Sequence, residues 1–184
     1  QKLGDVAAAS AVRAAVAELD DATPELTVSV KDGEVHGPGY DLDAQAQNQN
    51  EIIALTDWPY TDGALASTVV TVNARTNEII DTDIVFNCEQ HTFKVLTSPT
   101  PSTMEVDDVQ NTITHEIGHA LGLMHNPMDE DVVMFPRAAA GEVTKRVLRN
   151  DDRRGLEALY STAPVTPELP QQQVVGCSSS GGGV

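Results

Sequence analysis

Cysteine is scarce in this sequence of 184 residues, and so are basic side chains. Cys88 and Cys177 are the only cysteines, which excludes a fold built on a disulfide framework and leaves open whether these two pair. The 11 Lys and Arg residues are outnumbered by 28 Asp and Glu residues, for a formal net charge of −17. This imbalance argues against nucleic acid or an anionic membrane surface as partner. It is compatible with a secreted protein that binds calcium at its surface, although acidity alone names no ligand.

Long apolar runs are missing as well. No stretch of 18 apolar residues occurs, so we expect no membrane span. No signal peptide is visible, as would be true of a mature secreted chain and equally of a cytosolic one. The length suits one domain with its own core, which we place at residues 1–161. Residues 162–184 combine three prolines, a glutamine run and a Ser/Gly-rich end, which predicts a disordered tail or linker.

Hydrophobic periodicity predicts both helices and strands in the first half of the chain. Residues 5–19 are alanine-rich, with an apolar stripe that predicts a helix. The stripe consists of Val6, Ala9, Val12, Val16 and Leu19. Short strands are expected at residues 26–30 and 51–56. Residues 64–72 and 78–86 should form a hairpin, with Asn77 in a left-handed conformation at its turn.

Two helices are expected in the second half. One should span residues 106–122, with its N-terminus capped by Asp107 or Asp108. The other should span residues 149–160, with Asn150 or Asp151 at its start. Its inward-facing residues should be Leu156, Leu159 and Tyr160.

The most informative stretch is THEIGHALGLMH at residues 114–125, which holds three of the five histidines of the chain. On a helix, His115 and His119 project from one face about 40° apart, so both imidazoles can reach one metal ion at about 2.0–2.1 Å. Gly122 accepts a left-handed conformation that ends the helix, so the chain can turn back and bring His125 to the metal as third ligand. A fourth position is then left for water, as in catalytic zinc sites. Glu116 is placed to act on that water rather than on the metal.

HEIGHALGLMH resembles the long zinc-binding motif of the metzincin metallopeptidases. Over roughly residues 5–161 the chain resembles the matrixin branch of that clan, especially its small bacterial secreted members. The resemblance implies an α+β fold with α/β-like features, in which a twisted mixed sheet with an antiparallel edge strand accompanies a zinc helix and a C-terminal helix. It also implies a secreted protein, and we expect a monomer.

Further segments carry the resemblance to the matrixins. Residues 63–68 (GALAST) resemble the edge strand that pairs with substrate, which implies substrate-binding roles for Leu65 and Ala66, and residues 81–87 resemble the next strand. Residues 133–136 (VMFP) are similar to the Met-turn, which implies that Met134 forms the floor beneath the zinc. Residues 150–160 resemble the closing helix. In relatives, the wall of the S1′ pocket occupies the position of Pro136, Arg137 and Ala138, and the alanine suggests an open or differently filled pocket.

The chain also departs from the matrixin pattern. Asn126 follows the third histidine, where matrixins usually carry serine. Pro136 occupies the place of a tyrosine that is a fifth ligand in some metzincins. Ser67 replaces a histidine of the structural zinc site of vertebrate matrixins, so we expect one catalytic zinc and no structural one. The family also has a strand before the first helix, whereas this chain begins almost on the helix.

The resemblance implies a zinc-dependent endopeptidase that cleaves polypeptides. Zinc would lower the pKa of its bound water, and Glu116 would take the proton of that water and deliver it to the leaving amine. The substrate would align on the edge strand by β-augmentation. Two alternatives stay open: an aminopeptidase-type zinc enzyme, and a catalytically silent zinc-binding module. Three roles stay open for Cys177: its thiolate could occupy the open zinc position, it could form a disulfide with Cys88, or it could serve attachment or sorting.

Overall fold

The computed structural model describes residues 6–23, 26–31, 37–43, 48–60 and 63–161. Its centre is a three-stranded sheet with strand order β1-β3-β2. β1 (Ile52–Leu55) runs parallel to β3 (Ile79–Asn87), and β2 (Ala66–Val72) runs antiparallel to β3. The sheet is therefore mixed: the edge strand β2 is antiparallel to its neighbour, as expected, and the other edge strand, β1, is parallel to it.

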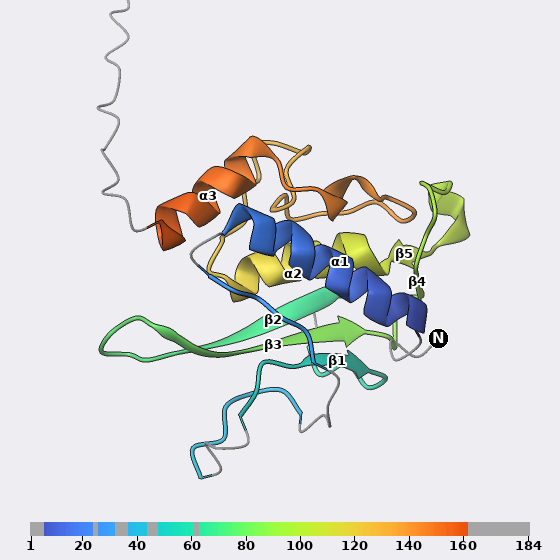
Figure 1. Cartoon of the computed structure of the whole chain (residues 1–184). Helices are drawn as coiled ribbons and strands as arrows, with labels where there is room; N and C mark the ends of the chain where they lie inside the picture. Colours follow the sequence, from blue (N-terminus) through green and yellow to red (C-terminus); the bar gives the residue numbers. More distant parts are fainter. Residues whose placement is uncertain (1–5, 24–25, 32–36, 44–47, 61–62, 162–184) are drawn as a thin grey trace, which may run out of the picture.

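Helices α1 (Val6–Ala22) and α2 (Val109–Ala120) pack against each other, and α2 also contacts β2 and β3 (Figure 1). The buried face of α1 is rich in alanine, which lets the two helices approach closely. It consists of Ala8, Ala11, Val12, Ala15, Val16 and Leu19. The predicted stripe is correct from Val12 onward but wrong at Val6, whose side chain is 89% exposed. The main core lies between these helices and the sheet.

The hairpin between β2 and β3 matches the prediction, and Asn77 has a φ of 59° at its turn. The strand predicted at residues 26–30 is wrong. The backbone N–H of Val28 donates to the carboxylate of Asp20 at 2.9 Å instead of to a neighbouring strand. Val28 and Val30 still pack against the core, which explains their apolar pattern.

Helix α2 begins at Val109 and is thus shorter at its start than predicted, because Asp107–Asp108 form the short strand β5, parallel to β4 (Phe93–Lys94). Asp108 is the N-cap and accepts the N–H of Asn111 at 2.8 Å. Its buried carboxylate also accepts the N–H of Leu96 at 2.9 Å and the Nε of Arg146 at 2.7 Å. These bonds fix the start of the helix that carries two of the candidate ligands.

Two short 3₁₀ turns occur in this half of the chain: η2 (Ser102–Met104) before β5, and η3 (Thr144–Arg146) before helix α3 (Asn150–Tyr160). Arg149 is the N-cap of α3 and Asn150 its first residue, so the helix begins at one of the two residues predicted for its start and one residue after the first residue of the predicted range. Leu156 is fully buried, but Leu159 is 54% exposed, contrary to prediction. Tyr160 donates its hydroxyl to the carbonyl of Leu121 at 2.9 Å and so ties α3 to the end of α2.

None of the helices in the described part of the chain is long and apolar enough to cross a membrane. Cys88 is half-buried and forms no disulfide with any described residue, and burial raises the pKa of its thiol. Cys177 and the rest of the predicted tail, residues 162–184, lie outside the described residues, so the predictions about them stay open.

Candidate active site

Three histidines converge as the sequence predicted. His115 and His119 come from α2, and Gly122, with a φ of 93°, turns the chain so that His125 returns to them. The Nε2 atom of His125 lies 3.2 Å from that of His115 and 3.1 Å from that of His119. Ligands of a tetrahedral zinc ion at about 2.0–2.1 Å lie about 3.3–3.4 Å from one another, and the two distances to His125 are close to this spacing. The ligand atoms of all three histidines lie within 4.8 Å of one another, so the set is placed to hold one zinc ion.

Backbone carbonyls orient two of the three rings. His115 Nδ1 lies 2.7 Å from the carbonyl oxygen of Val133, and His119 Nδ1 lies 2.8 Å from that of Leu123. Both Nδ1 atoms must donate to these carbonyls, so both Nε2 atoms present a lone pair to a shared point. Burial lowers the pKa of His115 to about 4 and also lowers that of His119. Both rings are therefore neutral at pH 7, as metal binding requires.

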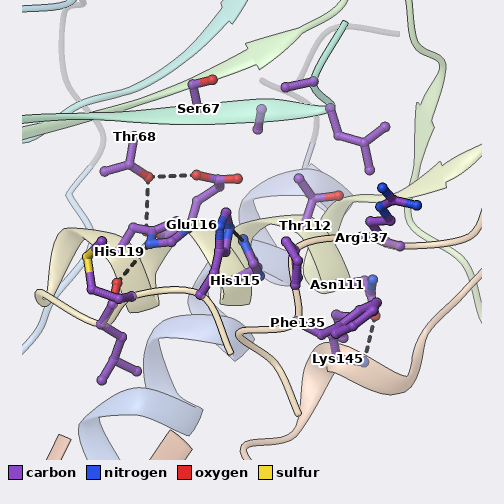
Figure 2. A pocket seen from close by; sticks show the side chains of 18 of the residues that line it. Ser67, Thr68, Asn111, Thr112, His115, Glu116, His119, Phe135, Arg137 and Lys145 are labelled. Carbon is purple, nitrogen blue, oxygen red and sulfur yellow. Dashed lines mark hydrogen bonds between the residues drawn. The ribbon is translucent and has the colours of Figure 1, made fainter. Parts of the chain in front are cut away.

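Glu116 lies beside the triad without joining it. Its side chain is buried, and its Oε2 lies 2.7 Å from the hydroxyl of Thr68 on β2 (Figure 2). The same hydroxyl lies 3.1 Å from the backbone carbonyl oxygen of Glu116. Burial raises the pKa of Glu116 to about 7, against the lowering effect of the Thr68 hydrogen bond. A carboxyl group with a pKa near neutrality can both accept and release a proton, which suits a general acid–base.

Met134, in the predicted Met-turn, belongs to the main core and packs against Gly118 of α2, which lies between His115 and His119 in the sequence. It is 2% exposed, and a Cβ added at Gly118 would overlap its sulfur, so glycine lets the helix pass over the methionine without displacing that side chain. The turn is held from α3: Asp152 accepts the N–H of Val133 at 3.0 Å and that of Met134 at 3.1 Å. The carbonyl that orients His115 belongs to this same turn, so α3 supports the triad indirectly.

The triad opens into a cavity of about 890 Å³ that runs along β2. All five residues predicted to bind substrate line it: Leu65, Ala66, Pro136, Arg137 and Ala138. Ser67 lines it as well. Because β2 pairs with β3 on one side only, its other edge is free to face this cavity.

Sequence reasoning missed Thr68 and the role of Asp152. Alternation along β2 could have indicated Thr68, because Thr68 lies on the same face of the strand as Ala66 and Val70. Asp152 lies in the segment that resembles the closing helix, but only the fold shows that its carboxylate reaches the Met-turn. Asn126, the departure after the third histidine, donates its side-chain amide to the neighbouring Asp151 at 2.8 Å.

Comparisons with known proteins agree with this geometry. The matrixin (peptidase M10) family model matches residues 10–161. The chain belongs to the matrixin family.

Individual matrixin relatives match over a shorter segment. Human matrix metalloproteinase-25 is 41% identical over 64 residues, which are 34% of this chain and 11% of that protein. Metalloendoproteinase 5-MMP of Arabidopsis thaliana is 42% identical over 59 residues, or 32% of this chain and 16% of the relative. Human neutrophil collagenase is 40% identical over 58 residues, or 30% of this chain and 12% of the relative. The matches thus span less than a fifth of each relative's length.

Proposed function

We propose that this matrixin domain is a zinc-dependent endopeptidase. The observation that carries the proposal is the convergence of three imidazole rings, whose ligand atoms lie within 4.8 Å of one another, next to a buried carboxyl group that is not part of the donor set. A purely structural zinc site has four protein ligands, whereas the described residues offer three here and the site opens into a cavity.

His115, His119 and His125 would hold the metal, and zinc bound there would polarise a peptide carbonyl and lower the pKa of water. Glu116 accepts a proton from the attacking water at its side-chain carboxylate and releases it to the leaving amine. Thr68 keeps the Glu116 side chain against β2 while the proton is held. Met134 is the packed floor that the ligand helix rests on.

The polypeptide would lie along the free edge of β2, where Leu65 and Ala66 offer main-chain hydrogen bonds. The cavity favours an endopeptidase over an aminopeptidase-type enzyme. An aminopeptidase needs a carboxylate to hold the substrate's terminal ammonium group, and the only carboxylate among the described lining residues is Glu116. A catalytically silent module is disfavoured because Glu116 and Met134 are both in place.

The proposal includes one catalytic zinc, secretion and a monomeric state. Family membership supports zinc and secretion. Surface calcium is a weaker part of it, because its only support is the net charge of −17.

The decisive experiment is digestion of a long unstructured protein with and without a zinc chelator. We expect internal cuts that stop with the chelator and return with added zinc. Glu116→Ala should retain zinc but lose turnover by about 10²–10⁴-fold, the usual contribution of a general acid–base. Trimming from the N-terminus alone would favour the aminopeptidase. Full activity of Glu116→Ala with zinc bound would refute the mechanism.

A further inference from the structure

The two ends of the cavity differ in chemistry. One end is lined by aliphatic side chains and Met124, namely Val70, Val72, Ile79, Leu123 and Met124. The other end, here called the polar end, is lined by Asn111, Thr112, Arg137 and Lys145. Figure 2 shows these four residues gathered on the side of His115 away from Thr68.

The donors of the polar end are held in position. Asn111 is 3% exposed, and its Oδ1 accepts the backbone N–H of Lys145 at 2.7 Å. Because the oxygen is used in this way, the amide presents its NH₂ group in the other direction, and Figure 2 shows that nitrogen on the side of Arg137. Asn111 therefore offers a fixed hydrogen-bond donor rather than an acceptor.

The charge of the polar end is positive, opposite to that of the whole chain. Arg137 is exposed, and its guanidinium forms no ion pair within the described residues. Lys145 has a side chain only 4% exposed, with Nζ 2.6 Å from Glu142 and 5.7 Å from the centre of the Phe135 ring. Lys145 lines the cavity and Glu142 does not. The ion pair therefore adds no carboxylate to the lining of the cavity.

The direction of β2 assigns the polar end to one side of the scissile bond. In Figure 2 Ser67 lies nearer the polar end than Thr68 does, so β2, which runs from Ala66 to Val72, is directed from the polar end toward the apolar end. A substrate strand antiparallel to β2 runs the opposite way, from the apolar end to the polar end. The substrate residues after the scissile bond then meet Asn111 and Arg137.

We propose that the polar end selects substrates with an acidic side chain, of the glutamate type, immediately C-terminal to the cleaved bond. This proposal rests on the proposed endopeptidase function. A carboxylate there would accept hydrogen bonds from the guanidinium of Arg137 and the amide of Asn111. An aliphatic side chain would instead cover these donors and leave them without partners, which is the stronger source of discrimination.

The test uses two peptides of identical composition, one with Glu directly after the scissile bond and Leu three positions later, the other with these residues exchanged. Identical net charge cancels the general repulsion expected from a chain of net charge −17. The zinc-loaded protein should cleave the first peptide with a kcat/KM about five- to tenfold higher, the range for a partly exposed ion pair plus a hydrogen bond. A third peptide with Gln in place of Glu should fall between them.

Arg137→Glu should reverse the preference, and should favour a peptide with Lys in that position. Arg137→Ala should bring the ratio close to one. Both changes are on an exposed side chain and should not disturb folding. Arg154→Glu, an equal change of charge at an exposed position on α3 outside the cavity, is the matched control and should keep the ratio of the parent.

A parent protein that cleaves the Leu peptide as fast as the Glu peptide, or a ratio that Arg137→Glu leaves unchanged, overturns the selectivity while leaving the endopeptidase function intact. If neither peptide is cleaved, the endopeptidase function fails instead. The selectivity is then judged by fluorescence polarisation of the two labelled peptides on zinc-loaded Glu116→Ala protein. Equal affinities would overturn it there too.

Discussion

Changing Asp152 to asparagine should weaken both the fold and the metal site. Asp152 is 2% exposed, and its carboxylate accepts three backbone N–H groups: Val133 at 3.0 Å, Met134 at 3.1 Å and Arg149 at 2.8 Å. Oδ2 takes the bonds from Val133 and Arg149, and Oδ1 takes the bond from Met134. An asparagine oxygen at the Oδ2 position keeps two of these bonds, without charge, but its NH₂ group then faces the N–H of Met134.

The magnitude follows from that geometry. One buried N–H loses its acceptor, at about 1–3 kcal/mol, and two charge-assisted bonds become neutral ones, so Asp152→Asn should destabilise the domain by about 2–4 kcal/mol. For a domain of this size, that lowers Tm by about 6–12 °C. The turn also carries the Val133 carbonyl that orients His115, so zinc affinity should fall about tenfold, the lower end for losing an outer-shell partner.

The assay is thermal unfolding with and without a chelator, together with competitive zinc titration. Asp151→Asn is the matched control, because Asp151 is the adjacent residue, is exposed and accepts only the side-chain amide of Asn126. It should shift stability by no more than about 0.5 kcal/mol. If Asp152→Asn unfolds within about 2 °C of the parent and binds zinc equally well, α3 does not support the triad as described.

Three further predictions concern ligand, packing and charge. His125→Ala removes a ligand, so zinc affinity should drop and peptidase activity should recover partly in excess zinc; activity independent of added zinc would contradict its role. Gly118→Ala places a Cβ on the sulfur of Met134 and should cost about 1–3 kcal/mol by overpacking, measured as a lower midpoint of urea unfolding; an unchanged midpoint would contradict this packing. Burial raises the pKa of Glu142, but hydrogen bonds and the charge of Lys145 outweigh it and bring the pKa below its ordinary value of 4.5. A lowered folded-state pKa stabilises the fold above pH 4.5, and the stabilisation is lost as the pH falls through the lowered value. Chelated parent and Glu142→Gln chains should therefore differ in unfolding free energy at neutral pH and converge in acid; a constant difference would contradict this linkage.

The metal triad could be predicted because its geometry is local. His115 and His119 are one helical turn apart, and Gly122 supplies the turn that brings back His125, so spacing alone determines the arrangement. The groups that orient and tune the triad come from distant segments. Thr68 lies on β2 and Asp152 on α3. Alternation along β2 predicts the face of the strand on which Thr68 lies, but no pattern in either segment predicts the contacts with Glu116 or with the Met-turn.

Errors in the predicted elements have the same origin. Asp107 and Asp108 read as part of a helix, but their pairing with Phe93 and Lys94 across the chain makes them a strand. Residues 26–30 have an apolar pattern typical of a strand, yet Val28 donates its N–H to Asp20. Periodicity reports which side chains are buried, but which backbone groups pair depends on partners that are far away in the sequence.

The link between Asp152 and the Met-turn has a consequence for biosynthesis, because Asp152 comes after the three histidines in the sequence. During translation the three histidines leave the ribosome before Asp152, so for some time the nascent chain holds every ligand but lacks the carboxylate that fixes the turn under His115. Full zinc affinity, and with it the full activity of the proposed peptidase, should arise only after α3 has docked. The domain thereby delays its own proteolytic competence to the end of folding, when its unfolded segments are no longer available to be cleaved.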